Sequence, residues 1–378
     1  MLDFSQFLAG PMAAMRLGDL GARVIKIEKP PTGDIGRGLA FGGIVADGDT
    51  LSFHITNRNK ESYAADLKSE ADRDRVLELV KEADVIVQNF RPGVMERLGF
   101  GYDEVKRINP KIVYGSISGY GAEGSFSKRP GQDLLAQSIS GLPWLSGSSD
   151  SPPIPVGIAL ADIITSIHMA HGITAALLKR ERTGAGSRVD TSLLESMLDL
   201  QFELISAHIT DPRVVVKRGA KHTAHAFLQA PYGIYPTADG YLALAMGSVP
   251  KLGELIGLVS LAQYEDPDTW WTEQTQITGL LAAHLKTQTT EHWLERLDAA
   301  DFWCAPVLTL PELVRHDGFD AINMVQQIHR QASDGSDLQL TTTRGPVRFD
   351  GEPLKTERGA PRVGEHTAAI NAELRGKE

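Results

Sequence analysis

Residues 83–121 read ADVIVQNFRPGVMERLGFGYDEVKRINPKIVYGSISGYG, and this stretch decides the fold class. It opens with the β-branched run DVIVQNF at 84–90 and closes with a second run, KIVYGS, at 111–116. Between the two runs, 94–98 and 102–108 have the composition of short helical turns. This spacing predicts a right-handed crossover between two parallel strands.

The same alternation extends toward the N-terminus. Further strands are predicted at Arg23–Glu28 (RVIKIE) and Ser62–Leu67, and a short one at Met1–Phe4. Helices are predicted at Pro11–Leu20, which has proline in its first turn and glycine after its end, and at Ser69–Ala83. The first third of the chain therefore predicts an α/β domain whose parallel sheet is covered on both faces.

Downstream of the predicted sheet, helical patterns dominate. Asp162–Arg182 is predicted to be one long helix, because its apolar residues recur near a 3.6-residue period. A hairpin is expected from the strand-like runs that flank Thr237–Gly240. The remaining predicted elements are a helix at 192–209, the hairpin strands at 232–235 and 241–245, and helices at 249–258, 272–285 and 290–297.

Length and this pattern set the predicted domain organisation. The chain has 378 residues, which at roughly 150 residues per domain suggests two or three domains. We predict a large domain over 1–214, a smaller α+β domain over 215–310 and a C-terminal segment, 311–378, that returns to the large domain.

The charge of the chain disfavours large anionic partners. Lys and Arg total 38 and Asp and Glu total 48, a formal net charge of −10, so we expect neither a nucleic-acid nor a membrane partner. Residues 1–130 contain 18 basic and 18 acidic side chains, so the whole deficit lies downstream. The neutral first third can therefore still hold a local basic site.

Cysteine content and hydropathy point to the cytoplasm. Cys304 is the single cysteine, which excludes an internal disulfide framework and a cysteine-based metal cluster. No run approaches 18 uncharged apolar residues, and Asp3 follows Met1-Leu2 where a signal peptide would begin its basic region. We therefore expect a cytoplasmic protein.

The first predicted turn argues against nucleotide cofactors. A strand, a helix and a strand that ends in Glu28 resemble the opening of a dinucleotide-binding fold, which requires G-x-G-x-x-G in its first turn. Phe7–Pro11 contains one glycine and a proline instead. The chain also lacks G-x-x-x-x-G-K-[ST], so both a nicotinamide dehydrogenase and a P-loop hydrolase are disfavoured.

Four basic residues follow the predicted strands. Lys29, Lys68, Arg91 and Arg97 come after the second, third and fourth strands. Because ligands of open α/β sheets gather at the carboxyl ends of strands, these cations are candidates for binding phosphates. The alternative is that they are solvated surface charges.

Two aspartates are candidate catalytic residues. Asp162 lies at the start of the long predicted helix, where its simplest role is an N-cap and its alternative role is a covalent nucleophile. Asp133, in Gly131-Gln132-Asp133, is the second candidate.

Other reactive residue types carry weaker signals. The pairs His168/His171 and His222/His225 lack further ligands at familiar spacing, so no metal is expected. The sequence has no G-x-S-x-G elbow, and Cys304 is interpreted as a small core residue.

Several long motifs together resemble the class III CoA-transferases, the formyl-CoA transferase and carnitine CoA-transferase type, whose superfamily includes the acyl-CoA racemases. The resemblance covers almost the whole chain. Its motifs are LAGPMAAMRLGDLGARVIKIEKP at 8–30, GDIGRG at 33–38, NRNKESYAADLKS at 57–69, the opening stretch at 83–121, VGIALADIITSIHMAHGITAALLKRERTGAG at 156–186, APV at 305–307 and GEHT at 364–367.

The resemblance implies a fold and a set of site residues. It implies a large Rossmann-like domain formed by both chain ends, a smaller domain and an interlocked homodimer. The nucleophile of the family falls on Asp162, with Asp133 close to it. The implied CoA-binding residues are Leu8 and Ala9 at the thioester end and Lys29, Lys68, Asn89, Phe90, Arg91 and Arg97 toward the nucleotide.

The implied reaction moves CoA from an acyl-CoA, such as succinyl-CoA or acetyl-CoA, to a small carboxylic acid. It passes through an aspartyl anhydride and an aspartyl-CoA thioester and uses no metal or tightly bound cofactor. Leu8 stands where formyl-CoA transferase has glutamine, and no glycine run like that enzyme's mobile loop is present, so neither oxalate nor formyl specificity is expected.

Two alternatives stay open. Racemases of the superfamily pair the aspartate with a histidine from a G-H-D segment, whereas this chain has Gln132, which cannot transfer protons. A racemase or isomerase is therefore the second hypothesis, and a non-catalytic CoA-binding protein is the third.

Overall fold

The computed structural model describes residues 1–39 and 41–376. The chain forms two compact units. The first unit comprises Met1–Ala136, Ile158–Leu200 and Ala321–Glu378, and the second comprises Gln137–Gly157 and Gln201–Asp320. The domain boundaries expected from the sequence, at 214/215 and 310/311, differ from the limits of these units and stay predictions.

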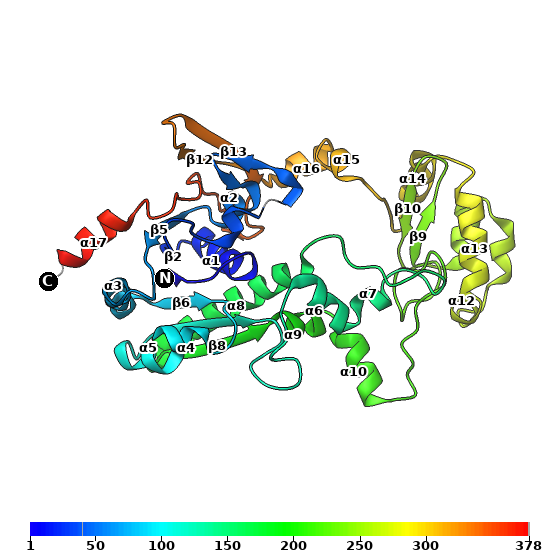
Figure 1. Cartoon of the computed structure of the whole chain (residues 1–378). Coiled ribbons are helices and arrows are strands. Elements are labelled where there is room, and N and C mark those ends of the chain that lie inside the picture. The colour runs from blue at the N-terminus through cyan, green and yellow to red at the C-terminus, as the bar shows by residue number, and fades with distance from the viewer. Residues whose placement is uncertain (40, 377–378) are drawn as a thin grey trace. The chain divides into compact units, whose positions relative to one another are not determined.

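The first unit is built on a six-stranded parallel sheet (Figure 1). The order across the sheet is β5, β2, β1, β6, β7, β8, with every neighbouring pair parallel. The strands are β1 (Leu2–Asp3), β2 (Val24–Glu28), β5 (Lys60–Ala64), β6 (Val85–Gln88), β7 (Val113–Ser118) and β8 (Ser187–Ser192). The predicted α/β class with a parallel sheet is therefore confirmed.

The strand order places a crevice at the centre of the sheet. Numbered along the chain within this sheet, the strands run 3-2-1-4-5-6, so the direction of winding reverses between β1 and β6. The loops after two such strands leave the sheet on opposite faces and open a crevice between them, where ligands of doubly wound folds bind. A ligand-binding site is therefore expected at the residues that follow Asp3 and Gln88.

Helices cover both faces of this sheet. Successive side chains of each strand point to opposite faces, so both faces carry apolar residues that must be buried. On one face, Ile25, Ile86 and their neighbours form an apolar core with α3, α5 and α17. On the other face, α1 packs beside α8. The principal helices are α1 (Ala9–Asp19), α3 (Glu70–Glu82), α4 (Val94–Leu98), α5 (Tyr102–Ile108), α8 (Leu160–Thr183), α9 (Leu193–Asp199) and α17 (Thr367–Arg375). The helix α6 (Asp133–Ser140) begins in this unit and continues into the second.

The helix α8 is the one described helix whose length and composition would also suit a membrane span. It contacts α1, α9, β7 and β8, and its buried residues include Met169 and Ile173. A core helix of a sheet domain has these same properties, and α8 is packed as one.

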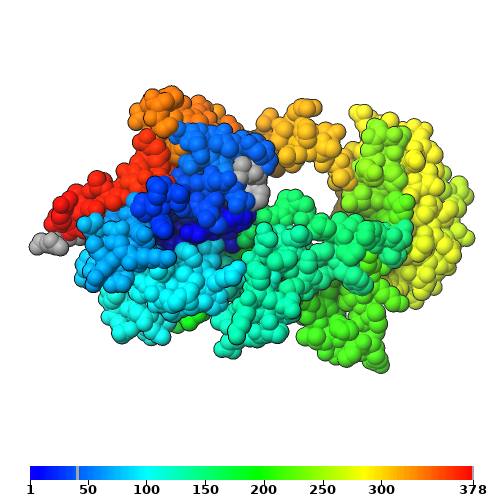
Figure 2. Space-filling view, in the orientation of Figure 1, coloured from blue at the N-terminus to red at the C-terminus, as the bar shows by residue number. Residues whose placement is uncertain are grey.

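The C-terminal segment completes the first unit. Arg330 of β12 (Val325–Gln331) forms ion pairs with Asp47 and Asp49. In the space-filling view this orange and red segment lies against the blue N-terminal part of the chain (Figure 2). The smaller elements of the unit are η1 (Ile35–Arg37), η2 (Phe41–Gly43), β3 (Val45–Ala46), β4 (Asp49–Thr50), α2 (Leu51–Thr56), β13 (Asp337–Thr343), β14 (Arg348–Phe349) and β15 (Glu352–Pro353).

The second unit has its own core around a small antiparallel sheet, β11, β10, β9. The predicted hairpin is present, with Leu242 opposite Tyr235. The elements are α7 (Leu142–Leu145), α10 (Phe202–Thr210), β9 (Gly233–Pro236), β10 (Tyr241–Leu244), α11 (Val249–Ile256), η3 (Val259–Gln263), α12 (Thr269–Thr272), α13 (Gln274–Leu285), α14 (Thr290–Asp298), β11 (Cys304–Pro306), α15 (Leu310–Leu313) and α16 (Asp317–Ile322), the last of which ends at the boundary with the first unit.

Around residue 190 one strand was missed and one predicted helix was wrong. Residues 187–192 form the edge strand β8, which the polar sequence SRVDTS did not indicate. The single helix predicted at 192–209 is two helices, α9 and α10, separated at Leu200–Gln201 and assigned to different units.

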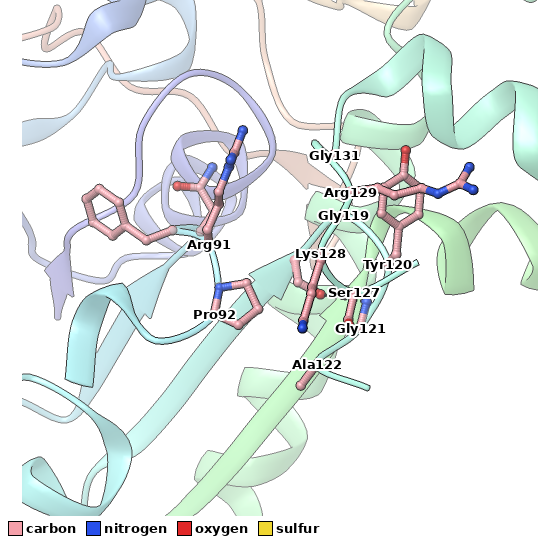
Figure 3. A pocket seen from close by; sticks show the side chains of 13 residues that line it. Arg91, Pro92, Gly119, Tyr120, Gly121, Ala122, Ser127, Lys128, Arg129 and Gly131 are labelled. Carbon is pink, nitrogen blue, oxygen red and sulfur yellow. Dashed lines mark hydrogen bonds between the residues drawn. The ribbon is translucent and has the colours of Figure 1, made fainter. Parts of the chain in front are cut away.

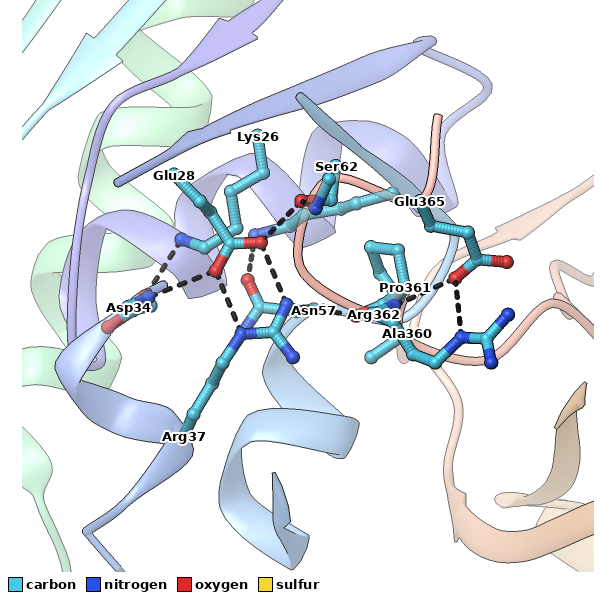
Figure 4. Close-up of polar contacts among 12 residues, drawn as sticks. Lys26, Glu28, Asp34, Arg37, Asn57, Ser62, Ala360, Pro361, Arg362 and Glu365 are labelled. Carbon is cyan, nitrogen blue, oxygen red and sulfur yellow. Dashed lines mark hydrogen bonds and ion pairs between the residues drawn. The ribbon is translucent and has the colours of Figure 1, made fainter. Parts of the chain in front are cut away.

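A row of buried charges runs along the α1 side of the sheet. Lys60 Nζ lies 2.8 Å from Asp3, and Lys26 Nζ lies 3.8 Å from Asp3 and 2.8 Å from Asp34. Burial alone would raise the pKa of Asp3, but Lys26 and Lys60 hold it at about 2. The row joins β5, β1 and β2 and ends at the loop after β2. Figure 4 shows its last pair, Lys26 and Asp34.

We expect Lys60→Met to lower the free energy of unfolding by about 3–5 kcal/mol, because removing one partner of a buried ion pair leaves the other poorly compensated. Lys60 also donates to Pro11 O and Asn57 Oδ1, both at 2.8 Å. Urea denaturation measures the change. As the control, Lys81→Met breaks an exposed pair with Glu78 and should cost at most about 1 kcal/mol; equal losses would contradict the prediction.

Candidate active site

The two loops at the switch point are tied to each other by one side chain. Asn89, just after β6, accepts from Gln6 N at 2.8 Å and donates from Nδ2 to Gln6 O at 2.7 Å. Gly10 packs against this junction, where an added Cβ would collide with Ser5 and approach Asn89. The loop after β1 is therefore fixed to the loop after β6 at the mouth of the crevice.

A cavity of about 490 Å³ opens at this junction, and its walls come entirely from the first unit. Both candidate aspartates, Asp133 and Asp162, line it. The other lining residues that matter here are Gln6–Ala9, Ile35, Asn89–Arg91, Gly131, Gln132, Leu135 and Leu193.

Asp162 lies in the first turn of α8, but it does not cap the helix. The N-cap residue is Ala159, which has no side-chain capping bond. Asp133 supplies the acceptor instead: its Oδ1 accepts from Ala161 N at 2.7 Å and from Asp162 N at 3.2 Å. The N-cap interpretation of Asp162 is therefore wrong, because a carboxylate from outside the helix takes that role.

The environment of Asp162 raises its proton affinity. The residue is 8% exposed, and burial followed by the negative charge of Asp133 raises the pKa of its carboxyl group to about 7. Near neutral pH the group is therefore divided between its charged and neutral forms. A buried carboxyl with a strongly shifted pKa in a cavity is a typical reactive group.

A second cavity, of about 430 Å³, adjoins the first and shares the wall formed by Asn89–Arg91 and Gly131. Figure 3 shows Arg91, Lys128 and Arg129 on its walls. Lys128 and Arg129 were missed in the sequence, although their position as a basic pair in the loop after a strand gave the same kind of signal as Arg91.

The predicted CoA-binding residues fall into two groups. Those that line the cavity with Asp162 are Leu8, Ala9, Asn89, Phe90 and Arg91. Lys29, Lys68 and Arg97 are exposed and are not among the residues that line the two cavities. Lys29 is 4.0 Å from Asp66 in an exposed pair. Binding roles for all of these residues stay predictions.

The histidines and the cysteine have other surroundings. Nδ1 of His168 lies 3.1 Å from Ser196 Oγ and its Nε2 lies 3.3 Å from Asp199, consistent with a role in helix packing. Burial, with Asp298 nearby, raises the pKa of the Cys304 thiol to about 11, so the thiol stays protonated at neutral pH. Over residues 1–39 and 41–376, no three His, Cys, Asp or Glu side chains cluster as a metal site.

Comparison with known proteins gives one family. A sequence model of CoA-transferase family III matches residues 1–367. The acetyl-CoA:oxalate CoA-transferase of Acetobacter aceti is 33% identical, over 100% of this chain and 95% of that protein. The succinate–glutarate CoA-transferase of Agrobacterium fabrum is 31% identical, over 99% and 94% of the two chains.

A solved structure has the same fold. The crystal structure of a CaiB/BaiF family protein from Brucella suis superimposes with a TM-score of 0.83 and 32% sequence identity. The match covers 99% of this chain and 97% of that one.

We expect Asp162→Asn to stabilise the folded chain at alkaline pH. A carboxyl whose pKa is raised from 3.8 to about 7 on folding gives stability that is present below pH 3.8 and lost as the pH rises through 7. Asparagine does not ionise, so the variant should exceed the wild type by on the order of 1–4 kcal/mol above pH 7.

Urea midpoints measured between pH 4 and pH 8 test this expectation, and the difference should shrink toward pH 4. Asp74→Asn, at an exposed position of α3, is the control and should show no such trend. A wild type that is as stable as Asp162→Asn at pH 8 would show that burial does not disfavour the charged form.

Proposed function

The chain belongs to CoA-transferase family III, and we propose that it moves CoA from an acyl-CoA donor, such as succinyl-CoA or acetyl-CoA, to a small carboxylic acid. One observation carries the proposal: Asp162, buried and with its pKa raised to about 7, lines a cavity at the switch point of the sheet. CoA enters this reaction as a substrate, and the chemistry requires no further cofactor.

The proposed mechanism is a covalent relay on Asp162. Its carboxylate attacks the thioester carbonyl of the donor, and CoA leaves as a thiolate, which gives a mixed anhydride. The thiolate then attacks the aspartyl carbonyl, releasing the donor acid and leaving an aspartyl-CoA thioester. The acceptor carboxylate repeats the two steps in reverse, so the new acyl-CoA departs and the carboxylate of Asp162 is restored.

Burial of Asp162 suits this chemistry in two ways. A poorly hydrated carboxylate is a better nucleophile than a solvated one, and bound CoA that covers the cavity would keep water away from an anhydride. Asp133 holds the backbone of the first turn of α8 through Ala161 N and Asp162 N, which leaves the Asp162 carboxylate free to react. The proposed role of Asp133 is therefore to orient the nucleophile and adjust its charge.

The proposed CoA site follows from the distribution of the cavity residues. The thioester end would lie against Leu8 and Ala9, because these residues share the cavity with Asp162. Asn89, Phe90 and Arg91 extend from there toward the nucleotide, and the further predicted nucleotide contacts are Lys29, Lys68 and Arg97. A nucleotide with several phosphates suits such exposed cations.

The acceptor is proposed only as a small carboxylic acid. The named relatives act on oxalate and on glutarate. Leu8, on the cavity wall, cannot donate a hydrogen bond from its side chain to a second carboxylate. This supports an acceptor other than oxalate.

A racemase is disfavoured by the residue beside Asp133. Gln132 lines the cavity and has no titratable proton, so a two-base exchange at the α-carbon lacks one base. Incubation of a 2-methylacyl-CoA in deuterated water without an acceptor acid separates the two reactions, and CoA transfer predicts no deuterium at the α-carbon.

We further propose that the chain acts in the cytoplasm as an interlocked homodimer. Apolar side chains exposed on a single chain support a partner, and α10 exposes Phe202 (68%) and Ile209 (71%). The single cysteine suits a reducing compartment.

Asp162→Ala should abolish CoA transfer, because the covalent relay then has no acceptor for the acyl group. The measurement incubates the protein with a panel of acyl-CoA donors and acids and detects new thioesters by mass. Hydroxylamine should release an acyl or CoA adduct from Asp162 in the wild type. Asp74→Ala is the control; transfer by Asp162→Ala at the wild-type rate would overturn the mechanism.

The pH profile should report the ionisation of Asp162. Because only the carboxylate attacks, kcat/KM should fall as the pH drops below about 7. Asp133→Asn should move this acid limb to lower pH, because it removes the neighbouring negative charge while Oδ1 still accepts from Ala161 N. An acid limb that does not move would show that Asp133 does not control the charge of Asp162.

A further inference from the structure

The loop that forms one wall of the Asp162 cavity holds a strained residue. Phe7 has φ +73°, in the left-handed region that favours glycine. Such a conformation in a non-glycine residue persists only where its surroundings impose it, and these residues cluster at functional sites. The neighbours of Phe7 along the chain, Gln6 and Leu8, line the same cavity.

One carboxylate is placed to impose this conformation. Oδ1 of Asp34 accepts from Phe7 N at 3.0 Å and from Gly36 N at 2.8 Å. Lys26 Nζ lies 2.8 Å from Oδ2 of Asp34 and also donates to Ser5 O at 2.8 Å. A single ammonium–carboxylate pair therefore contacts both ends of the segment Ser5–Phe7.

The Lys26–Asp34 pair is buried, and both of its side chains are charged. The Lys26 and Asp34 side chains are each 1% exposed. Burial alone would raise the pKa of Asp34, yet Lys26 and the N–H groups of Phe7 and Gly36 hold it below its usual value. Asp34 is thus a charged acceptor near neutral pH. Asn89 bonds Gln6 from the other side, so all three residues of the segment are fixed.

We propose that Asp34, held by Lys26, is a positioning residue that keeps Phe7 left-handed and so sets Leu8 and Ala9 against Asp162. The inference rests on the proposed function for its catalytic consequence. Without the charged acceptor, Phe7 relaxes to negative φ and the wall formed by Leu8 and Ala9 moves. Displacements of about 1 Å in a reacting geometry cost on the order of 100-fold in rate.

The first test is Asp34→Asn, which keeps the size of the side chain and its Oδ1 acceptor but removes the charge that pairs with Lys26 through Oδ2, so that the buried ammonium no longer holds the side chain in place. We expect kcat for CoA transfer to fall by about 10-fold to 100-fold, with KM for the acyl-CoA changed by less than about threefold, because the nucleotide contacts stay in place. Asp19→Asn is the matched control: it breaks a buried pair with Arg58 (2.6 Å) at the other end of α1 and should leave kcat unchanged.

A double-mutant cycle separates positioning from general loss of stability. Glycine adopts left-handed φ without strain. In a Phe7→Gly background, residue 7 therefore does not need Asp34 to hold it at positive φ. We expect Asp34→Asn to lower kcat by less than about threefold in that background. A full 10-fold loss there, or an equal loss in Asp19→Asn, would overturn the proposal.

Hydrogen exchange gives a readout that needs no activity. The amides of Ser5–Ala9 should exchange at least 10-fold faster in Asp34→Asn and at the wild-type rate in Asp19→Asn. If the wild type transfers no CoA, the proposed function fails, yet this exchange still decides whether Asp34 holds the loop. Unchanged exchange in Asp34→Asn would overturn the inference.

A further pair of variants keeps the proposal testable if Asp34→Asn does not fold. Phe7→Gly and Phe7→Ala both remove the ring, but only alanine retains the cost of positive φ. We expect Phe7→Gly to have the higher urea midpoint. Equal midpoints would show that Phe7 is not held against its preference.

Discussion

The rest of the first unit depends on a constraint inside its sheet: charges that are buried must be paired. Lys60, Asp3, Lys26 and Asp34 form a continuous row of alternating sign beneath α1. An unpaired member would cost several kcal/mol, so the chain can fold only with β5, β1 and β2 in the register that joins them. The row thereby fixes where the loop after β1 leaves the sheet, and that loop is a wall of the cavity.

The same constraint, left unmet, explains the raised pKa of the candidate nucleophile, Asp162. Asp34 has a cation at 2.8 Å and its pKa is lowered, whereas Asp162 is similarly buried beside another carboxylate and its pKa is raised. Two aspartates in one unit thus differ in pKa because one is paired with a cation and the other lies beside a second carboxylate. Burying Asp162 beside Asp133 destabilises the folded chain, and the paired row offsets this cost because it holds the surrounding backbone in place.

Sequence patterns predicted the parallel sheet because β2, β6 and β7 are β-branched runs between helical segments. They missed β8, whose SRVDTS sequence is polar because an edge strand is only partly buried. They also gave no sign that Lys26 is buried, since its partners Asp3 and Asp34 come from separate segments that meet only in the fold. Burial of a charge depends on tertiary partners, which one sequence does not reveal.

The candidate site, too, was predicted in part from the sequence, and the rest depends on tertiary contacts. Asp162 and Asp133 were identified by position, and the resemblance to the family placed them close together, but the hydrogen bonds from the first turn of α8 to Asp133 were not foreseen. A carboxylate in the first turn of a helix ordinarily satisfies a backbone N–H group, which would occupy the oxygen that a nucleophile needs. Asp133 removes this conflict by accepting from Ala161 N and Asp162 N itself. Because Asp133 accepts from the N–H groups at the start of α8, the carboxylate of Asp162 is not needed there and can face the cavity.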